Sequence, residues 1–177
     1  MPTDIHALAA AIDASCRIRG EFTLRSGLSV DEYFDKYRFE GDPRLLREVA
    51  EAMVPLLPDD TDVVGGLELG GVPIATMVSS VTGLPAIFVR KEAKTYGTCK
   101  VAEGQDFAGC TVTLIEDIIT TGGAVRSAAG ALRELDATVH TVVCAIDRSE
   151  PGQNALHKIG LNTISIMTKD DLDAVRS

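Results

Sequence analysis

One twelve-residue segment, TLIEDIITTGGA at residues 113–124, places two adjacent acids, two threonines and two glycines at the end of an apolar run. A buried carboxylate pair repels itself and gains nothing from packing, so the two acids point to a ligand. Backbone N–H groups at the following turn can bind a phosphate, and carboxylates accept hydrogen bonds from sugar hydroxyls. The segment therefore predicts a site for a phosphorylated sugar. The alternative is a capped turn whose acids coat the edge of a sheet.

A basic cluster stands out in a chain of net charge −9. The segment RKEAKTYGTCK, residues 90–100, holds four of the seventeen Lys and Arg residues. Such a run is most often a solvated surface patch. This one follows the apolar run AIFV and opens the one long loop of the chain, residues 91–106. Because long loops in compact domains often act as lids, we expect an anion-binding loop that closes over the sugar phosphate.

The elements that must position these residues begin with a helix over about residues 3–16, indicated by apolar residues at helical spacing. Aromatic and β-branched residues then indicate short strands near 21–25 and 32–39, joined by a turn. Asp42 followed by a proline predicts a capped helix that runs to about residue 56.

Beyond residue 60 the chain alternates between buried strands and amphipathic helices, which is typical of an α/β fold with a mainly parallel sheet and helices on both faces. Sheets of this kind bind ligands beyond the carboxyl ends of their strands. Four loops are therefore expected to be neighbours in space: residues 65–71, 90–105, 116–123 and 147–153.

The composition limits the class of protein. A chain of 177 residues, 45% hydrophobic and without internal repeats or linkers, predicts a single domain over 1–177. The acidic balance argues against nucleic acid, and no apolar run approaches the roughly 20 residues that span a bilayer. The four cysteines form no C-x-x-C pair, which argues against a zinc site and a disulfide framework. With no signal peptide expected, the sequence indicates a cytoplasmic protein without a membrane partner.

The segment TLIEDIITTGGA resembles the phosphoribosyl-pyrophosphate (PRPP) signature of the type I phosphoribosyltransferases. Four further segments are similar, in order and spacing, to the orotate phosphoribosyltransferase family: GEFTLRSG, LGGVPIA, RKEAKTYG and DRSEPG. Together they cover nearly the whole chain. The resemblance implies a type I phosphoribosyltransferase fold with a small N-terminal hood region.

The resemblance also implies roles for individual residues. Glu116 and Asp117 match acids that hold the ribose hydroxyls, and Lys94 matches a cation that assists the leaving group, so Lys94 and Asp117 are the candidate catalytic residues. The further PRPP-binding candidates are Arg25, Arg90, Lys91, Tyr96, Ile118, Ile119, Thr120, Thr121, Gly122, Gly123 and Ala124. The orotate-binding candidates are Tyr33, Phe34, Thr120 and Arg148.

Three positions depart from the commonest pattern of the family. Arg25 stands where lysine is usual, which keeps the charge and changes the donor geometry. Gly70 stands where some members have lysine. Tyr96 takes the place of a loop histidine, and a phenol with a pKa of roughly 10 brings no positive charge to the leaving group at neutral pH.

The implied reaction joins orotate to PRPP, giving orotidine 5′-monophosphate and pyrophosphate for pyrimidine biosynthesis. The resemblance implies a homodimer that shares the loop 91–106 across its interface. Mg²⁺ is the expected cofactor, bound mainly by substrate oxygens rather than by protein ligands. Two alternatives stay open. A purine-type transferase is disfavoured by Arg148, because purines carry no carboxylate. A non-catalytic, PRPP-sensing regulatory protein is disfavoured by the intact basic loop, whereas Tyr96 keeps it open.

Overall fold

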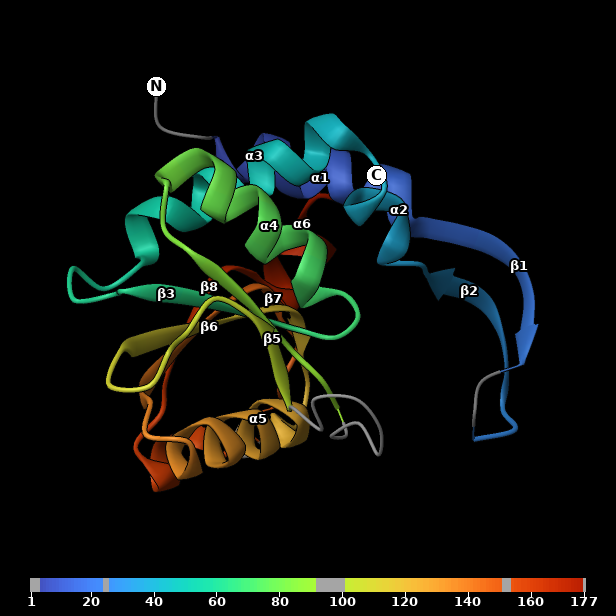
Figure 1. Cartoon of the computed structure of the whole chain (residues 1–177). Coiled ribbons are helices and arrows are strands. Elements are labelled where there is room, and N and C mark those ends of the chain that lie inside the picture. Colours follow the sequence, from blue (N-terminus) through green and yellow to red (C-terminus); the bar gives the residue numbers. More distant parts are fainter. Residues whose placement is uncertain (1–3, 24–25, 92–100, 151–153, 177) are drawn as a thin grey trace.

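The computed structural model describes residues 4–23, 26–91, 101–150 and 154–176. Its centre is a six-stranded sheet in the order β5-β4-β3-β6-β7-β8 (Figure 1). Neighbouring strands run parallel except β4 and β5, which pair antiparallel. The mainly parallel sheet expected from the alternating pattern is confirmed. Its strands are β3 (Val63–Leu67), β4 (Ala86–Val89), β5 (Ala102–Gly104), β6 (Thr111–Ile119), β7 (Thr138–Asp147) and β8 (Asn162–Thr168).

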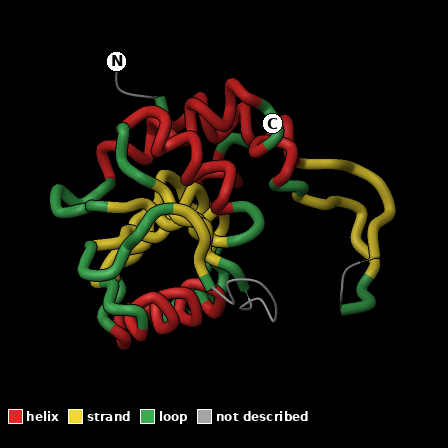
Figure 2. The backbone as a smooth tube through the Cα atoms, in the orientation of Figure 1, coloured by secondary structure: helices red, strands yellow, loops and turns green. Residues whose placement is uncertain are grey.

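Helices cover both faces of the sheet, so that the strands lie between two helical layers (Figure 2). On one face α1, α3 and α4 bury Ile12, Met53 and Ile74 against the sheet. On the other face α5 buries Leu132. The helices and 3₁₀ turns are α1 (Ile5–Cys16), α2 (Tyr37–Glu40), α3 (Pro43–Met53), η1 (Val54–Leu56), α4 (Gly71–Thr82), α5 (Gly123–Glu134), η2 (Leu156–Ile159) and α6 (Lys169–Ala174).

Side-chain caps fix the starts of the first two long helices. The carboxylate of Asp4 accepts hydrogen bonds from the first backbone N–H groups of α1, and that of Asp42 does the same for α3. Pro43 occupies the first turn of α3, where its missing N–H is not needed. Both helix starts agree with the sequence to within two residues.

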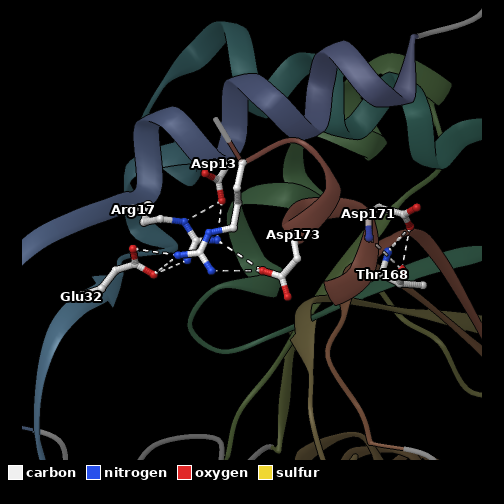
Figure 3. Close-up of polar contacts among 7 residues, drawn as sticks. Asp13, Arg17, Glu32, Thr168, Asp171 and Asp173 are labelled. Atoms are coloured by element: carbon white, nitrogen blue, oxygen red, sulfur yellow. Dashed lines mark hydrogen bonds and ion pairs between the residues drawn. The ribbon is translucent and has the colours of Figure 1, made fainter.

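An antiparallel hairpin of β1 (Arg17–Thr23) and β2 (Ser29–Phe34) projects from the body of the molecule (Figure 1). An ion-pair network joins its base to α1 and α6 (Figure 3). Arg17 contacts Asp13 at 2.6 Å and also pairs with Glu32, which in turn accepts from Arg176 at 2.7 Å. Asp173 of α6 completes the network at 3.8 Å from Arg17. The hairpin is the small N-terminal hood expected from the resemblance.

Two expected boundaries are wrong. The strand expected over 32–39 ends at Phe34, because the chain turns there and residues 37–40 form α2. That short helix buries Phe39 completely in the core beside α1 and α3, a gain that an extended strand would lose. The first strand begins at Arg17, not near residue 21.

The long loop also contains structure, since Ala102–Gly104 form the edge strand β5. In the described part of the chain, no helix is long and apolar enough to cross a membrane. The cytoplasmic location stays a prediction.

Candidate active site

A cavity of about 770 Å³ lies at the carboxyl ends of β3, β4 and β6. Three of the four loops expected to meet there line it. The fourth loop adjoins them through its backbone, because the N–H of Arg148 donates to the carbonyl of Ile119 at 2.8 Å. The lining includes all of the described PRPP-binding candidates, namely Arg90, Lys91 and every residue from Glu116 to Ala124.

The two acids of β6 start on opposite faces of the sheet, because successive strand residues alternate. Asp117 lies on the same face of the sheet as Ile115, the face that α3 and α4 cover, and its side chain is only 1% exposed. One carboxylate oxygen pairs with the ammonium of Lys36, and the other accepts from the N–H of Ile118. Burial acts to raise the pKa of Asp117, but the hydrogen bonds from Lys36, Glu116 and the backbone of Ile118, together with the charge of Lys36, outweigh it and the pKa is lowered. Asp117 is therefore ionised in the free protein.

Glu116 lies on the opposite face of the sheet and also borders the cavity. Burial, and then the negative charge of Asp117, raise its pKa to about 9. The side chain accepts a hydrogen bond from the backbone N–H of Asp117 at 3.1 Å. At neutral pH the pair thus carries one negative charge, so the repulsion expected between two adjacent buried carboxylates does not arise.

Gly70 supplies the space for the Asp117 carboxylate. A Cβ at this position would lie 1.6 Å from Oδ2 of Asp117 and 2.9 Å from Oε1 of Glu40. The backbone of Gly70 is ordinary, with φ −66° and ψ −33°, so the site needs the missing side chain and not an unusual conformation. The absence of a side chain at Gly70 therefore leaves room for the Asp117 carboxylate.

The turn after β6 has the geometry expected of a phosphate site. Thr120 and Thr121 are exposed in the cavity wall, and α5 begins at Gly123 without a side-chain cap, which leaves its first N–H groups for a ligand. Gly122 adopts φ +71°, and a Cβ there would meet Leu156 at 2.9 Å. The side chain of Ile119 is 1% exposed in the core, so only its backbone is available to a ligand.

The two basic residues that follow β4 line the cavity. Arg90 lies 4.0 Å from Glu68 and 4.0 Å from Glu103, and its buried Nε has no hydrogen-bond partner among the described residues. Because this N–H group is already buried, it can donate a hydrogen bond to an anionic ligand with little further desolvation cost. Lys91 is exposed beside it. The candidates Arg25, Lys94 and Tyr96 lie outside the described residues.

The orotate-binding candidates do not all lie in one place in the structure. The guanidinium of Arg148 lies 5.6 Å from the ring centroid of Phe34, and both line a second cavity of about 290 Å³ beside α6. Tyr33 points the other way along β2, is 44% exposed and packs on Phe22 at 5.5 Å between ring centroids. Thr120 lines the larger cavity. The structure therefore brings Phe34 and Arg148 together and leaves Tyr33 apart.

Lys36 also lines the cavity and is not among the residues predicted from the sequence. It follows the aromatic pair of β2 by two positions, in a segment expected to be a strand, and its ammonium also lies 5.3 Å from the Tyr37 ring. Its partner Asp117 is 81 positions away. Its position two residues after Phe34, an expected residue of the base pocket, was the feature of the sequence that could have indicated it.

Comparisons with known proteins identify the family of this chain. The family model described as the phosphoribosyl transferase domain matches residues 38–167. An orotate phosphoribosyltransferase from a Nocardioides strain is 66% identical over 169 residues, covering 96% of this chain and 94% of the relative. The chain belongs to the orotate phosphoribosyltransferase family. Within this family, a crystal structure from Mycobacterium tuberculosis in complex with Fe(III) dicitrate superposes with a TM-score of 0.85 at 32% identity, covering 96% and 98% of the two chains.

A second orotate phosphoribosyltransferase structure from Mycobacterium tuberculosis, solved in complex with PRPP, has a TM-score of 0.79 at 30% identity and covers 96% of this chain and 99% of its own. The fold of the orotate phosphoribosyltransferase family thus extends over the hairpin as well as the sheet.

Proposed function

We propose that this chain is an orotate phosphoribosyltransferase that transfers the 5-phosphoribosyl group of PRPP to orotate in the cavity at the end of β6. The observation that carries the proposal is the convergence in one cavity of an ionised Asp117, an uncapped helix start and Arg90, whose buried Nε has no hydrogen-bond partner among the described residues. The 66% identical relative bears the same activity in its name, and a structural relative was solved with PRPP.

In this proposal the 5-phosphate lies on the turn Thr120–Ala124, where N–H groups and two hydroxyls can donate to it. Asp117 accepts hydrogen bonds from the ribose hydroxyls, and Glu116, protonated in the free protein, can also donate one. Arg90 and Lys91, with Lys94 from the basic loop, stabilise the charge that develops on pyrophosphate as the ribose gains oxocarbenium character. Lys94 and Asp117 remain the proposed catalytic residues.

Mg²⁺ is part of the proposal, carried mainly by PRPP oxygens. In the described part of the chain no cluster of three or more His, Cys, Asp or Glu side chains is placed to hold a metal. The protonated Glu116 and the Lys36-paired Asp117 fit an ion that takes most of its ligands from the substrate. When bound, it would neutralise charge on the leaving pyrophosphate.

Arg148 is the proposed partner of the orotate carboxylate, with Phe34 beneath its guanidinium. Arg148→Ala should raise the KM for orotate at least tenfold, because a charge-assisted hydrogen bond is worth roughly 1.5–3 kcal/mol, and should leave the KM for PRPP nearly unchanged. Steady-state kinetics with each substrate varied in turn measures both constants. Arg44→Ala, which removes an arginine that is 86% exposed on α3, is the matched control. An unchanged orotate KM would remove Arg148 from the base site.

The same assay, run with adenine, hypoxanthine, guanine and uracil in place of orotate, separates the proposed function from a purine-type transferase. Nucleotide formation is expected from orotate and not from the purines.

We also propose that the active form is a homodimer whose loop 91–106 reaches the partner's cavity, and that the chain 1–177 acts as one domain.

A further inference from the structure

Two carboxyl groups and one lysine meet at the ribose side of the cavity. Asp117 and Lys36 border the cavity itself. Glu40, from α2, lies behind them and is only 6% exposed, and its Oε1 has no hydrogen-bond partner within the described part of the chain. Because the point above Gly70 is close to both Oδ2 of Asp117 and Oε1 of Glu40, the two acids flank the same space.

Charge balance decides the state of this cluster. The single ammonium of Lys36 compensates the single charge of Asp117, so a second buried carboxylate would have no counterion. Burial, and then the neighbouring Asp117, raise the pKa of Glu40 to about 8, whereas Lys36 acts to lower it. Among the described residues, Asp35 also raises this pKa. The buried thiol of Cys16 on α1 lies nearby, and its own pKa is shifted by Asp35, Arg38 and Glu40.

We propose that Glu40 is a positioning residue for PRPP, a neutral carboxyl that backs Asp117 and keeps the Lys36 ammonium at the ribose side of the cavity. The inference rests on the proposed role of Asp117 in holding the ribose. Glu40 does not border the cavity and acts only through its two neighbours. When Glu40 loses its proton, its carboxylate competes for Lys36 and adds negative charge behind an anionic substrate. Both effects weaken PRPP binding above about pH 8.

The test compares the KM for PRPP and kcat between pH 6.5 and 9.5 in the wild type, Glu40→Gln and Glu40→Ala. In the wild type the KM for PRPP should rise several-fold between pH 7 and pH 8.5, as Glu40 with its pKa of about 8 loses its proton. Loss of the Glu116 proton, with a pKa of about 9, should add a further rise at higher pH in all three proteins. Glu40→Ala should raise this KM about tenfold at pH 7, with a smaller change in kcat. Glu40→Gln keeps the shape and a neutral donor, so it should restore most of the affinity and remove the rise between pH 7 and pH 8.5.

Controls separate this inference from the proposed function. Glu51→Gln removes an exposed carboxylate on α3 and should keep the wild-type pH profile. If Glu40→Gln keeps the rise between pH 7 and pH 8.5, or if Glu40→Ala binds PRPP as the wild type does, the role of Glu40 is wrong while the PRPP site stands. If Asp117→Asn in the same series leaves PRPP binding unchanged, both the ribose site and this inference fall.

Folding gives a second readout. Because the pKa of Glu40 is raised in the folded state, the unfolded chain releases this proton first, and stability falls as pH rises from about 4.5 to about 8. Glu40→Gln lacks that loss, so its melting temperature should exceed that of the wild type by a margin that grows between pH 5 and pH 8. A constant margin would show that Glu40 is charged in the folded protein and would overturn the inference.

Discussion

Replacing Gly70 with alanine should reduce PRPP-dependent turnover about 100-fold or more. The added Cβ would lie 1.6 Å from Oδ2 of Asp117, far inside any allowed contact, so the carboxylate must leave its position beside Lys36. Displacements of about 1 Å in a reacting constellation can cost a factor of about 100. Since the φ and ψ of Gly70 suit alanine, the loss would come from steric overlap alone.

Steady-state kinetics and thermal denaturation check this prediction together. Overpacking at Gly70 is expected to cost about 1–3 kcal/mol of stability in addition to the loss of turnover. The matched control is Gly130→Ala in the middle of α5, where nothing lies within 4 Å of the added methyl. That variant should keep wild-type turnover and gain about 0.5–1 kcal/mol of stability. A Gly70→Ala protein with a wild-type KM for PRPP would show that Asp117 does not need this space.

Mixing two inactive variants should restore activity if the basic loop is shared between subunits. Lys94→Ala and Asp117→Ala are each expected to be nearly inactive alone. In a mixed dimer with a shared loop, one site receives both lesions and the other receives neither. Random exchange should therefore recover about a quarter of wild-type sites, given a two-fold interface. Activity measured before and after subunit exchange gives the result.

The structure of a single subunit is also compatible with a loop that closes over its own cavity. Lys91 and Val101, at the two ends of the segment 92–100, both line that cavity. A loop that closes over its own subunit would leave one lesion in every site of a mixed dimer, and no activity would return. Exchange is verified with differently tagged subunits. Recovery near a quarter supports the shared loop, and verified exchange without recovery contradicts it.

Much of the fold was predictable because its signals are local. Alternating buried runs and helical periodicity located the sheet strands and the long helices, and the capping residues Asp4 and Asp42 marked two helix starts. The segment around residues 35–40 was not predictable in this way. Its aromatic residues suit a strand, yet burying Phe39 under α1 requires a helical turn, and the benefit of that contact is tertiary.

The residues that gather at the cavity were largely predictable, whereas their charge states were not. The acids, threonines and glycines of β6 and its turn lie together as the sequence suggested. The pairing of Lys36 with Asp117, the proton that Glu116 retains and the clearance at Gly70 all depend on residues distant in sequence that meet only in the fold. Likewise Phe34 and Arg148 meet only because β2 ends beside β7.

The central claim, that Asp117 holds the ribose of PRPP, is tested most directly by titrating PRPP with Mg²⁺ into wild-type and Asp117→Asn protein in a calorimeter. Asparagine keeps the shape and removes the charge-assisted bonds, worth roughly 1.5–3 kcal/mol, so the Kd should rise about 10- to 100-fold. Asp60→Asn, in an exposed carboxylate that pairs with His140 at 3.0 Å, is the matched control and should bind as the wild type does. A folded Asp117→Asn protein with an unchanged Kd for PRPP would contradict the account.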